Sequence, residues 1–216
     1  MLIGHSLADQ YGNLLSVDSQ VCEIMHREVH ELVGVSFAAL THPDDCTRNV
    51  IAVASLRAED GASTIRKRYV RPDGSFVWAN VQVSRLQGGE AGKLIGTIQL
   101  IDCGSLRRGP EGLWRAARLE DGLLQRRRLQ LGEDLFSDFA WLILLQVYLA
   151  EAEGRVATVA TISDTAVIAP SAVRHWLELL EQRQLVERVT ARDPFLQLSP
   201  SGWGKIEYLL DSGFDM

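Results

Sequence analysis

The sequence predicts an α+β protein with two small domains joined by a helical segment. Its 216 residues, 46% of them hydrophobic, give room for two cores of ordinary size. The first hundred residues contain apolar side chains that alternate with period two, whereas the last eighty contain runs with helical spacing. We therefore expect an antiparallel sheet with helices on one face (1–103), a helical linker (104–132) and a mainly helical domain with two short strands (133–216).

The charge is uneven along the chain. The net charge of -6 divides into -3 over residues 1–103, +4 over 104–132 and -7 over 133–216. The longest apolar run, 139–150, is about twelve residues and too short for a bilayer span, which needs roughly twenty. With no basic, apolar leader and no C-x-x-C spacing among the three cysteines, we expect a cytoplasmic protein that does not engage a membrane.

The strands of the first domain are visible as alternation. In "GSFVWANVQVS" (74–84), Val77, Ala79, Val81 and Val83 alternate with polar and aromatic side chains, which predicts a strand with one inner face. The turn residues Pro72-Asp73-Gly74 before it join two strands into a hairpin. A third strand is expected over 93–102, and Pro43 predicts a helix start capped by Thr41 or His42.

Several segments together resemble a PAS domain over about residues 6–103: "DQYGNLLSVDSQVCEI", "ELVGVSFAALTHPDD", "VRPDGSFVWANVQVS" and "GTIQLID". The resemblance implies a sensor. Flavin-binding members carry an N-C-R-F-L-Q type motif where this chain has "VGVSFAALTHPDDC", and haem-binding members use a histidine in a later helix, whereas 48–61 has none. We expect neither flavin nor haem, and the cofactor, if one exists, stays unknown.

His26 and His30 lie four apart, at helical spacing, and could bind a metal or a haem. No third ligand accompanies them, so a solvated helix face is favoured and no metal site is expected. The residues expected to line a PAS cavity are Cys22, Met25, Phe37, Leu40, Val77, Ala79, Val81, Ile98 and Leu100. They form either a plain hydrophobic core or a pocket for a small apolar ligand.

Two kinds of apolar surface predict a homodimer. Phe76 and Trp78 alternate to the outer side of the predicted strand, where exposed aromatic side chains favour a partner. The linker opens with Pro110 and ends before Gly132, and its Leu113 and Leu124 form part of an apolar stripe. Charged residues interrupt this stripe, so a strong coiled coil is not expected. Linker residues Arg126, Arg127 and Arg128 are candidates for phosphate contacts.

The last part of the chain reads as a helix over 137–154, a short second helix, the turn "APS" and a third helix, "AVRHWLELLEQRQ". Two short strands around Arg192-Asp193-Pro194 and a final helix follow. This order resembles the MarR-like winged helix-turn-helix of bacterial regulators over about residues 134–212. The resemblance implies that Ser171, Arg174 and His175 face DNA bases and that Arg188 and Arg192 lie at the wing.

Two functions stay open. The first is a transcription regulator whose PAS domain senses a ligand or partner and whose winged helix binds double-stranded DNA as a dimer. The second is a signalling adaptor whose acidic winged helix serves dimerisation or protein docking, because a domain at -7 binds phosphates weakly. We expect no enzyme, since the sequence contains no P-loop, nucleophile elbow or metal triad.

Overall fold

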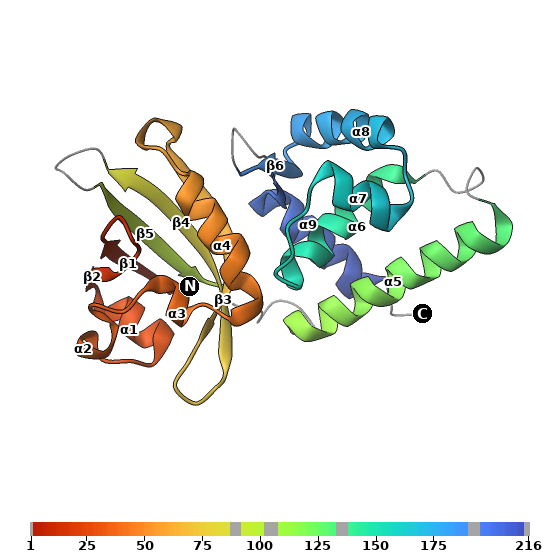
Figure 1. Cartoon of the computed structure of the whole chain (residues 1–216). Coiled ribbons are helices and arrows are strands. Elements are labelled where there is room, and N and C mark those ends of the chain that lie inside the picture. Colours follow the sequence, from red (N-terminus) through yellow and green to blue (C-terminus); the bar gives the residue numbers. More distant parts are fainter. Residues whose placement is uncertain (1, 87–91, 102–107, 133–137, 190–194, 214–216) are drawn as a thin grey trace. The chain divides into compact units, whose positions relative to one another are not determined.

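A computed structural model describes residues 2–86, 92–101, 108–132, 138–189 and 195–213. The chain forms two compact units, Met1–Asp102 and Cys103–Met216 (Figure 1). Each unit has its own secondary structure and its own core, as expected for two domains.

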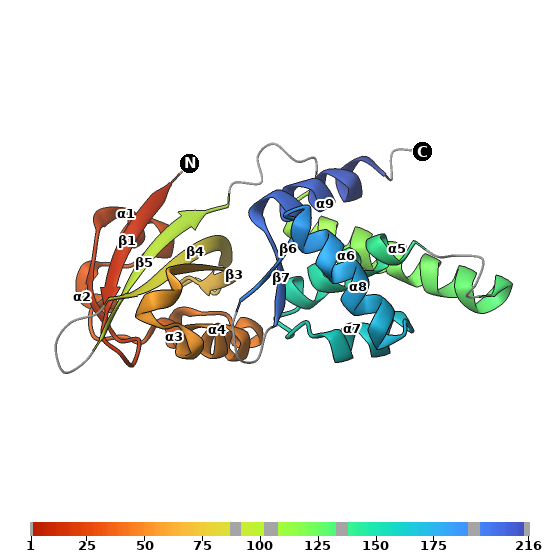
Figure 2. The ribbon, with the colours of Figure 1, turned by 90° about the horizontal axis from the view of Figure 1, so that it is seen from above.

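The first unit is built on a five-stranded antiparallel sheet with the strand order β2-β1-β5-β4-β3. The strands are β1 (Ile3–Ala8), β2 (Leu14–Val17), β3 (Ala62–Val70), β4 (Phe76–Leu86) and β5 (Lys93–Leu100). The helices are α1 (Ser19–Met25), α2 (Val29–Leu32), α3 (Phe37–Leu40) and α4 (Pro43–Ser55), followed by the 3-10 turn η1 (Ala58–Asp60). The helices gather on one face of the sheet (Figures 1 and 2), which confirms the predicted antiparallel sheet with one covered face.

Local signals explain where these elements begin and turn. The amide N–H of Asp44 donates to His42 Nδ1 over 3.4 Å, and Pro43 occupies the first helical position of α4. Between β3 and β4, Gly74 adopts a φ of 80° that favours glycine, and the Asp73 carboxylate accepts hydrogen bonds from Ser75. The predicted helix cap and hairpin are therefore confirmed.

The predicted helical spacing of His26 and His30 is wrong. His26 has a φ of 52° and ends α1 as its left-handed C-cap, so the chain leaves the helix before His30 enters α2. Among the described residues, no group of three histidine, cysteine or acidic side chains could hold a metal ion.

The second unit consists of five helices and one two-stranded antiparallel ribbon among its described residues. The helices are α5 (Pro110–Leu131), α6 (Phe139–Ala152), α7 (Val159–Ala166), α8 (Pro170–Gln182) and α9 (Pro200–Ser212), and the strands are β6 (Val186–Arg188) and β7 (Leu196–Leu198). Helix α6 is apolar almost all round and lies at the centre of the core. None of the helices within the described ranges combines the length and apolar run needed to cross a membrane.

The helix predicted as a separate linker belongs to this second core. Leu113 and Ala117 of α5 are fully buried, and α5 packs against α6 and α9. The sequence did not reveal this buried face, because basic residues are frequent in α5, and one of them, Arg128, is itself buried.

Candidate functional site

A cavity of about 40 Å³ lies between the sheet and the helices of the first unit. Its wall is mainly apolar and is formed by Ala8, Leu14, Val21, Met25, Phe37, Leu40, Val53, Val81, Val83, Leu94, Gly96 and Ile98, together with the polar residues Ser6, Asn49, Lys67 and Tyr69. This volume holds about three water molecules. Pockets for drug-sized ligands are typically about 300–1,000 Å³, so the cavity suits a ligand of only a few non-hydrogen atoms.

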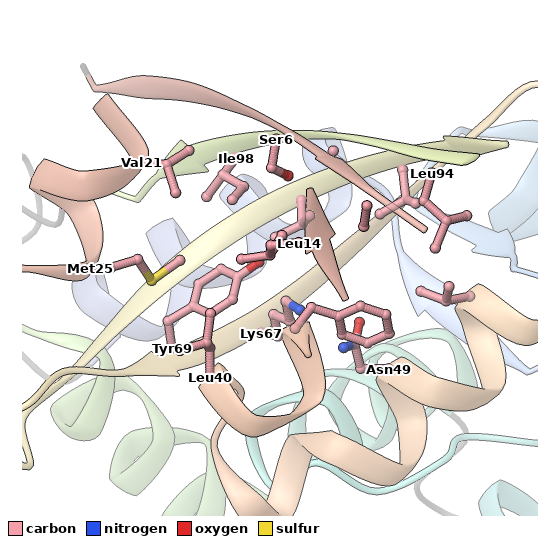
Figure 3. Close-up of a pocket in the computed structure, with 16 residues that line it drawn as sticks. Ser6, Leu14, Val21, Met25, Leu40, Asn49, Lys67, Tyr69, Leu94 and Ile98 are labelled. Carbon is pink, nitrogen blue, oxygen red and sulfur yellow. The ribbon is translucent and has the colours of Figure 1, made fainter. Parts of the chain in front are cut away.

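Lys67 of β3 brings a buried amine to this cavity (Figure 3). Only 2% of the residue is exposed, and its Nζ donates to Thr41 Oγ1 over 3.1 Å. The ammonium also lies 4.4 Å from the ring centroid of Tyr69 and 5.0 Å from that of Phe37, within the range of cation–π contacts. Loss of hydration on burial lowers the pKa of Lys67 from 10.5 to about 7, partly offset by the carboxylate of Asp45.

Asn49 and Tyr69 add two further polar groups. Asn49 of α4 is buried, and its Nδ2 has no hydrogen-bond partner among the described residues. Burial raises the pKa of the Tyr69 phenol well above its ordinary value, so this group stays a neutral hydroxyl at physiological pH. The cavity therefore combines an apolar wall with an amine, an amide and a phenol.

Five of the nine predicted lining residues border the cavity: Met25, Phe37, Leu40, Val81 and Ile98. The other four, Cys22, Val77, Ala79 and Leu100, do not line it. Ala79 is buried but small, while Val77 and Leu100 are half-buried near the end of the pairing between β4 and β5. Cys22 borders a separate surface hollow with His26 and Glu28.

The polar wall was missed because only apolar residues were considered as lining. A sequence signal was present in "STIRKRYV" (63–70): Lys67 lies between Ile65 and Tyr69 at the alternate positions that face inward. A lysine in register with two core residues indicates a buried amine.

On the opposite sheet face, Phe76 and Trp78 already have partners within the first unit. The guanidinium of Arg68 lies 5.8 Å from the Phe76 ring centroid and 5.3 Å from that of Trp78. Arg68 is held by Asp45, whose two carboxylate oxygens accept hydrogen bonds at 2.7 and 3.0 Å. Phe76 is 48% exposed, whereas Trp78 is half-buried. Phe76 is therefore the more accessible of the two predicted dimer residues.

In the second unit, the exposed face of α8 carries Ser171, Arg174 and His175. They occupy the first turns of the helix, while Val173, Leu177 and Leu180 turn into the core. Helix α7 precedes α8 by a turn of three residues, 167–169. The three side chains predicted to face bases are thus brought together on one exposed surface.

The remaining basic candidates are less available. Arg128 is buried and donates hydrogen bonds to the backbone carbonyls of Ala166 and Val167, so it is not a surface arginine as predicted. Arg188 is engaged by Glu181, with 2.5 Å between Nε and Oε1. Arg126 and Arg127 are exposed. Arg192 lies outside the described residues.

The predicted apolar stripe of α5 also needs correction. Leu113 is fully buried in the core of its own unit, and Leu124 packs against that core. A dimer contact cannot use Leu113 while the unit is folded. The exposed leucines of this helix are Leu119, Leu129 and Leu131, and the predicted apolar stripe did not identify these three together.

A match to a known protein family falls within the first unit. Residues 14–98 match the protein family described as PAS fold. A stretch of 107 residues is 29% identical to the probable diguanylate cyclase DgcE of Escherichia coli K12, covering 49% of this chain and 10% of that protein. The chain thus spans about a tenth of the length of this relative.

Solved structures of PAS domains are similar to less than half of the chain. The PAS domain of an HTR-like protein from Haloarcula marismortui is 17% identical, with a TM-score of 0.42, over 46% of this chain and 81% of that one. A PAS domain from Colwellia psychrerythraea is 16% identical, with a TM-score of 0.43, over 47% and 87% of the two chains. The family match supports a PAS domain in the N-terminal part, which indicates a role in signal sensing.

Proposed function

We propose that this protein is a signal-responsive transcription regulator, in which the PAS domain senses a small ligand and the second unit binds double-stranded DNA. The observation that carries the DNA-binding part is the exposed cluster of Ser171, Arg174 and His175 at the start of α8. Arginine recognises guanine through two hydrogen bonds in the major groove, and hydroxyl and imidazole groups also contact base edges.

The arrangement of elements in the second unit supports the same proposal. Helices α7 and α8 with their short turn, followed by the β6–β7 ribbon and α9, have the order of a winged helix-turn-helix of the MarR-like kind. In such a domain the second helix of the pair enters the major groove with its N-terminal residues. The proposed DNA-reading residues lie at that end of α8.

A second candidate function is a docking module without DNA binding. The ion pair between Arg188 and Glu181 and the burial of Arg128 favour it, because both remove positive charge that could meet phosphates. In either function the protein is not an enzyme, acts in the cytoplasm and forms a homodimer, with Phe76 among the candidate contacts. A monomer found by light scattering at tens of micromolar, roughly the weak end of specific association, would contradict the dimer.

The experiment that separates the two functions is selection from random DNA duplexes. The full-length protein is incubated at low salt with a pool of random duplexes, and the bound molecules are sequenced. The regulator is expected to enrich a palindromic motif, because a dimer presents two copies of α8. Enrichment of no motif would overturn the DNA-binding proposal and favour the docking module.

A further inference from the structure

The polar groups of the PAS cavity form a set of hydrogen-bond donors beside an apolar wall. In Figure 3, Lys67 and Asn49 enter the cavity from β3 and α4 in the same region, and Tyr69 extends into it from β3. A core that only filled space would place apolar groups at these positions, because each unsatisfied buried polar group costs about 1–3 kcal/mol.

The amine of Lys67 is held in place by Thr41. The hydroxyl of Thr41 donates to the Phe37 carbonyl oxygen over 2.8 Å and therefore accepts, through its lone pair, the hydrogen bond from Lys67 Nζ. Within the described ranges no carboxylate forms an ion pair with Lys67, and the nearby Asp45 directs both of its oxygens to Arg68. One donor position of the amine is thus fixed, while the other donor positions have no anionic partner among the residues that the structure describes.

Asn49 provides the second, independent observation. Its Nδ2 lies fully buried without a hydrogen-bond partner, on a side chain that borders the cavity. Amide groups in protein interiors are normally paired, so an unpaired one that faces a cavity indicates a missing partner. The partner that suits both Asn49 Nδ2 and Lys67 Nζ is a hydrogen-bond acceptor with negative charge.

We infer that the PAS cavity is a binding site for a small aliphatic monocarboxylate, whose carboxylate accepts hydrogen bonds from Lys67 and Asn49 and whose alkyl part lies against the apolar wall. The inference deepens the sensing role proposed above by naming the class of ligand. The wall formed by Val21, Met25 and Ile98 provides the apolar surroundings for the alkyl part. The cavity volume of about 40 Å³ favours a chain of two to four carbons, since it holds about three waters.

The direct test is to titrate the full-length protein with sodium propionate and, separately, with propionamide. Binding is monitored through the NMR chemical shifts of the backbone amides of Lys67, Asn49 and Tyr69. The two compounds have nearly the same size and differ in charge. Propionate is expected to bind about tenfold more tightly, because hydrogen bonds to charged groups are the stronger ones. Equal affinities, or the absence of saturable shifts with either compound at about 10 mM, would overturn the inference.

A matched pair of lysine variants tests whether the preference for propionate depends on the Lys67 amine. Lys67→Met keeps the length of the side chain and removes the amine, so it should abolish the preference for propionate. Lys93→Met alters an exposed lysine at the start of β5 and should leave the preference unchanged. A preference that survives in Lys67→Met would contradict the assignment of the amine.

The pH dependence of the wild-type protein gives a test without any variant. The groups that act on Lys67 are Asp45, Cys46 and Arg48 of α4, with the neutral Tyr69 on the same strand. Because the pKa of Lys67 is about 7, propionate binding above that pH requires uptake of a proton, and affinity should fall about tenfold per pH unit. If the affinity for propionate does not change between about pH 6 and 9, the inference is overturned. These measurements of propionate binding do not involve DNA. A negative result would therefore contradict the carboxylate site without contradicting the proposed DNA binding.

Discussion

In the PAS domain, Lys67 and Asn49 are buried beside a cavity, whereas in the second unit Asp121 is buried between two glutamines that donate hydrogen bonds to it. The distances from Gln125 Nε2 and Gln146 Nε2 to the Asp121 carboxylate oxygens are 2.9 and 2.7 Å. Asp121 is thus paired within its own unit, but Asn49 has an unpaired donor. With the inferred carboxylate site, the difference separates an interior proposed to receive a ligand from one in which the buried polar group is paired within the fold.

The comparison also distinguishes where each unit is proposed to bind: the first at an interior cavity and the second at an exposed surface. The first unit presents its chemistry inward, at a cavity, and one of its most conspicuous outer features, the aromatic pair, is covered in part by Arg68. The second unit has a packed core and presents Arg174 outward on α8. We therefore expect mutations in the cavity of the first unit to impair ligand binding without affecting DNA binding, and mutations on α8 of the second unit to have the opposite effect.

The largest predicted effect concerns the ion pair that anchors α4 to β3. Asp45→Asn leaves the guanidinium of Arg68 without its buried counter-ion, which should destabilise the first unit by about 3–5 kcal/mol. Hydrogen exchange of the β3 and β4 amides measures this loss. Asp44→Asn is the matched control, because Asp44 is exposed and its 3.4 Å pair with Arg68 should contribute about 0–1 kcal/mol. Equal effects of the two variants would contradict the account of this anchor.

The next effect tests whether α5 belongs to the core of the second unit. Leu113→Ala should destabilise that unit by about 2–5 kcal/mol, because the side chain is fully buried against α6. Leu119→Ala, on the exposed side of the same helix, should change stability by about 0.5 kcal/mol or less. Urea unfolding of both variants provides the measurement. A stable Leu113→Ala protein that loses only its dimer would restore the interpretation of α5 as a separate linker.

The smallest effect sharpens the contrast between the two buried polar sites. Burial raises the pKa of Asp121, although Gln125 and Gln146 partly offset it, so the folded state holds this proton more tightly than the unfolded state. The stability that Asp121 contributes is therefore greatest at low pH and is lost as the pH rises through its raised pKa. Asp121→Asn should remove this dependence of stability on pH, which thermal unfolding measured from about pH 3 to 7 would show. A wild-type stability that increases relative to that of the variant as the pH rises would contradict the prediction.

The sequence predicted the secondary structure well because its signals are local. Pro43 and Pro110 begin helices as predicted, and the alternation in 74–84 marks β4, whereas Pro170 and Ser171, predicted to lie in a turn, are the first residues of α8. What the sequence did not reveal depends on contacts between distant residues. The burial of Arg128 follows from carbonyl groups 38 and 39 residues away, and nothing in "QRRRLQ" distinguishes it from its neighbours.

The site was predicted only in part for the same reason. The apolar wall follows from alternation, so Val81 and Ile98 could be identified as inward-facing. The role of Asn49 depends on the absence of a partner in three dimensions, which no local pattern indicates. The exposed residues of α8 could be predicted because Val173, Leu177 and Leu180 fix the orientation of the helix.

The measurement that tests the proposed function most directly compares the affinity of three full-length proteins for the duplex enriched by selection. Wild type, Arg174→Ala and Arg127→Ala are titrated at several salt concentrations and against a scrambled duplex. Arg174→Ala should lose about 1–3 kcal/mol on the enriched duplex and discriminate less between the two sequences. Arg127→Ala should weaken binding to both duplexes similarly and flatten the salt dependence. If Arg174→Ala binds the enriched duplex as wild type does at low salt, α8 does not read DNA and the regulator proposal is contradicted.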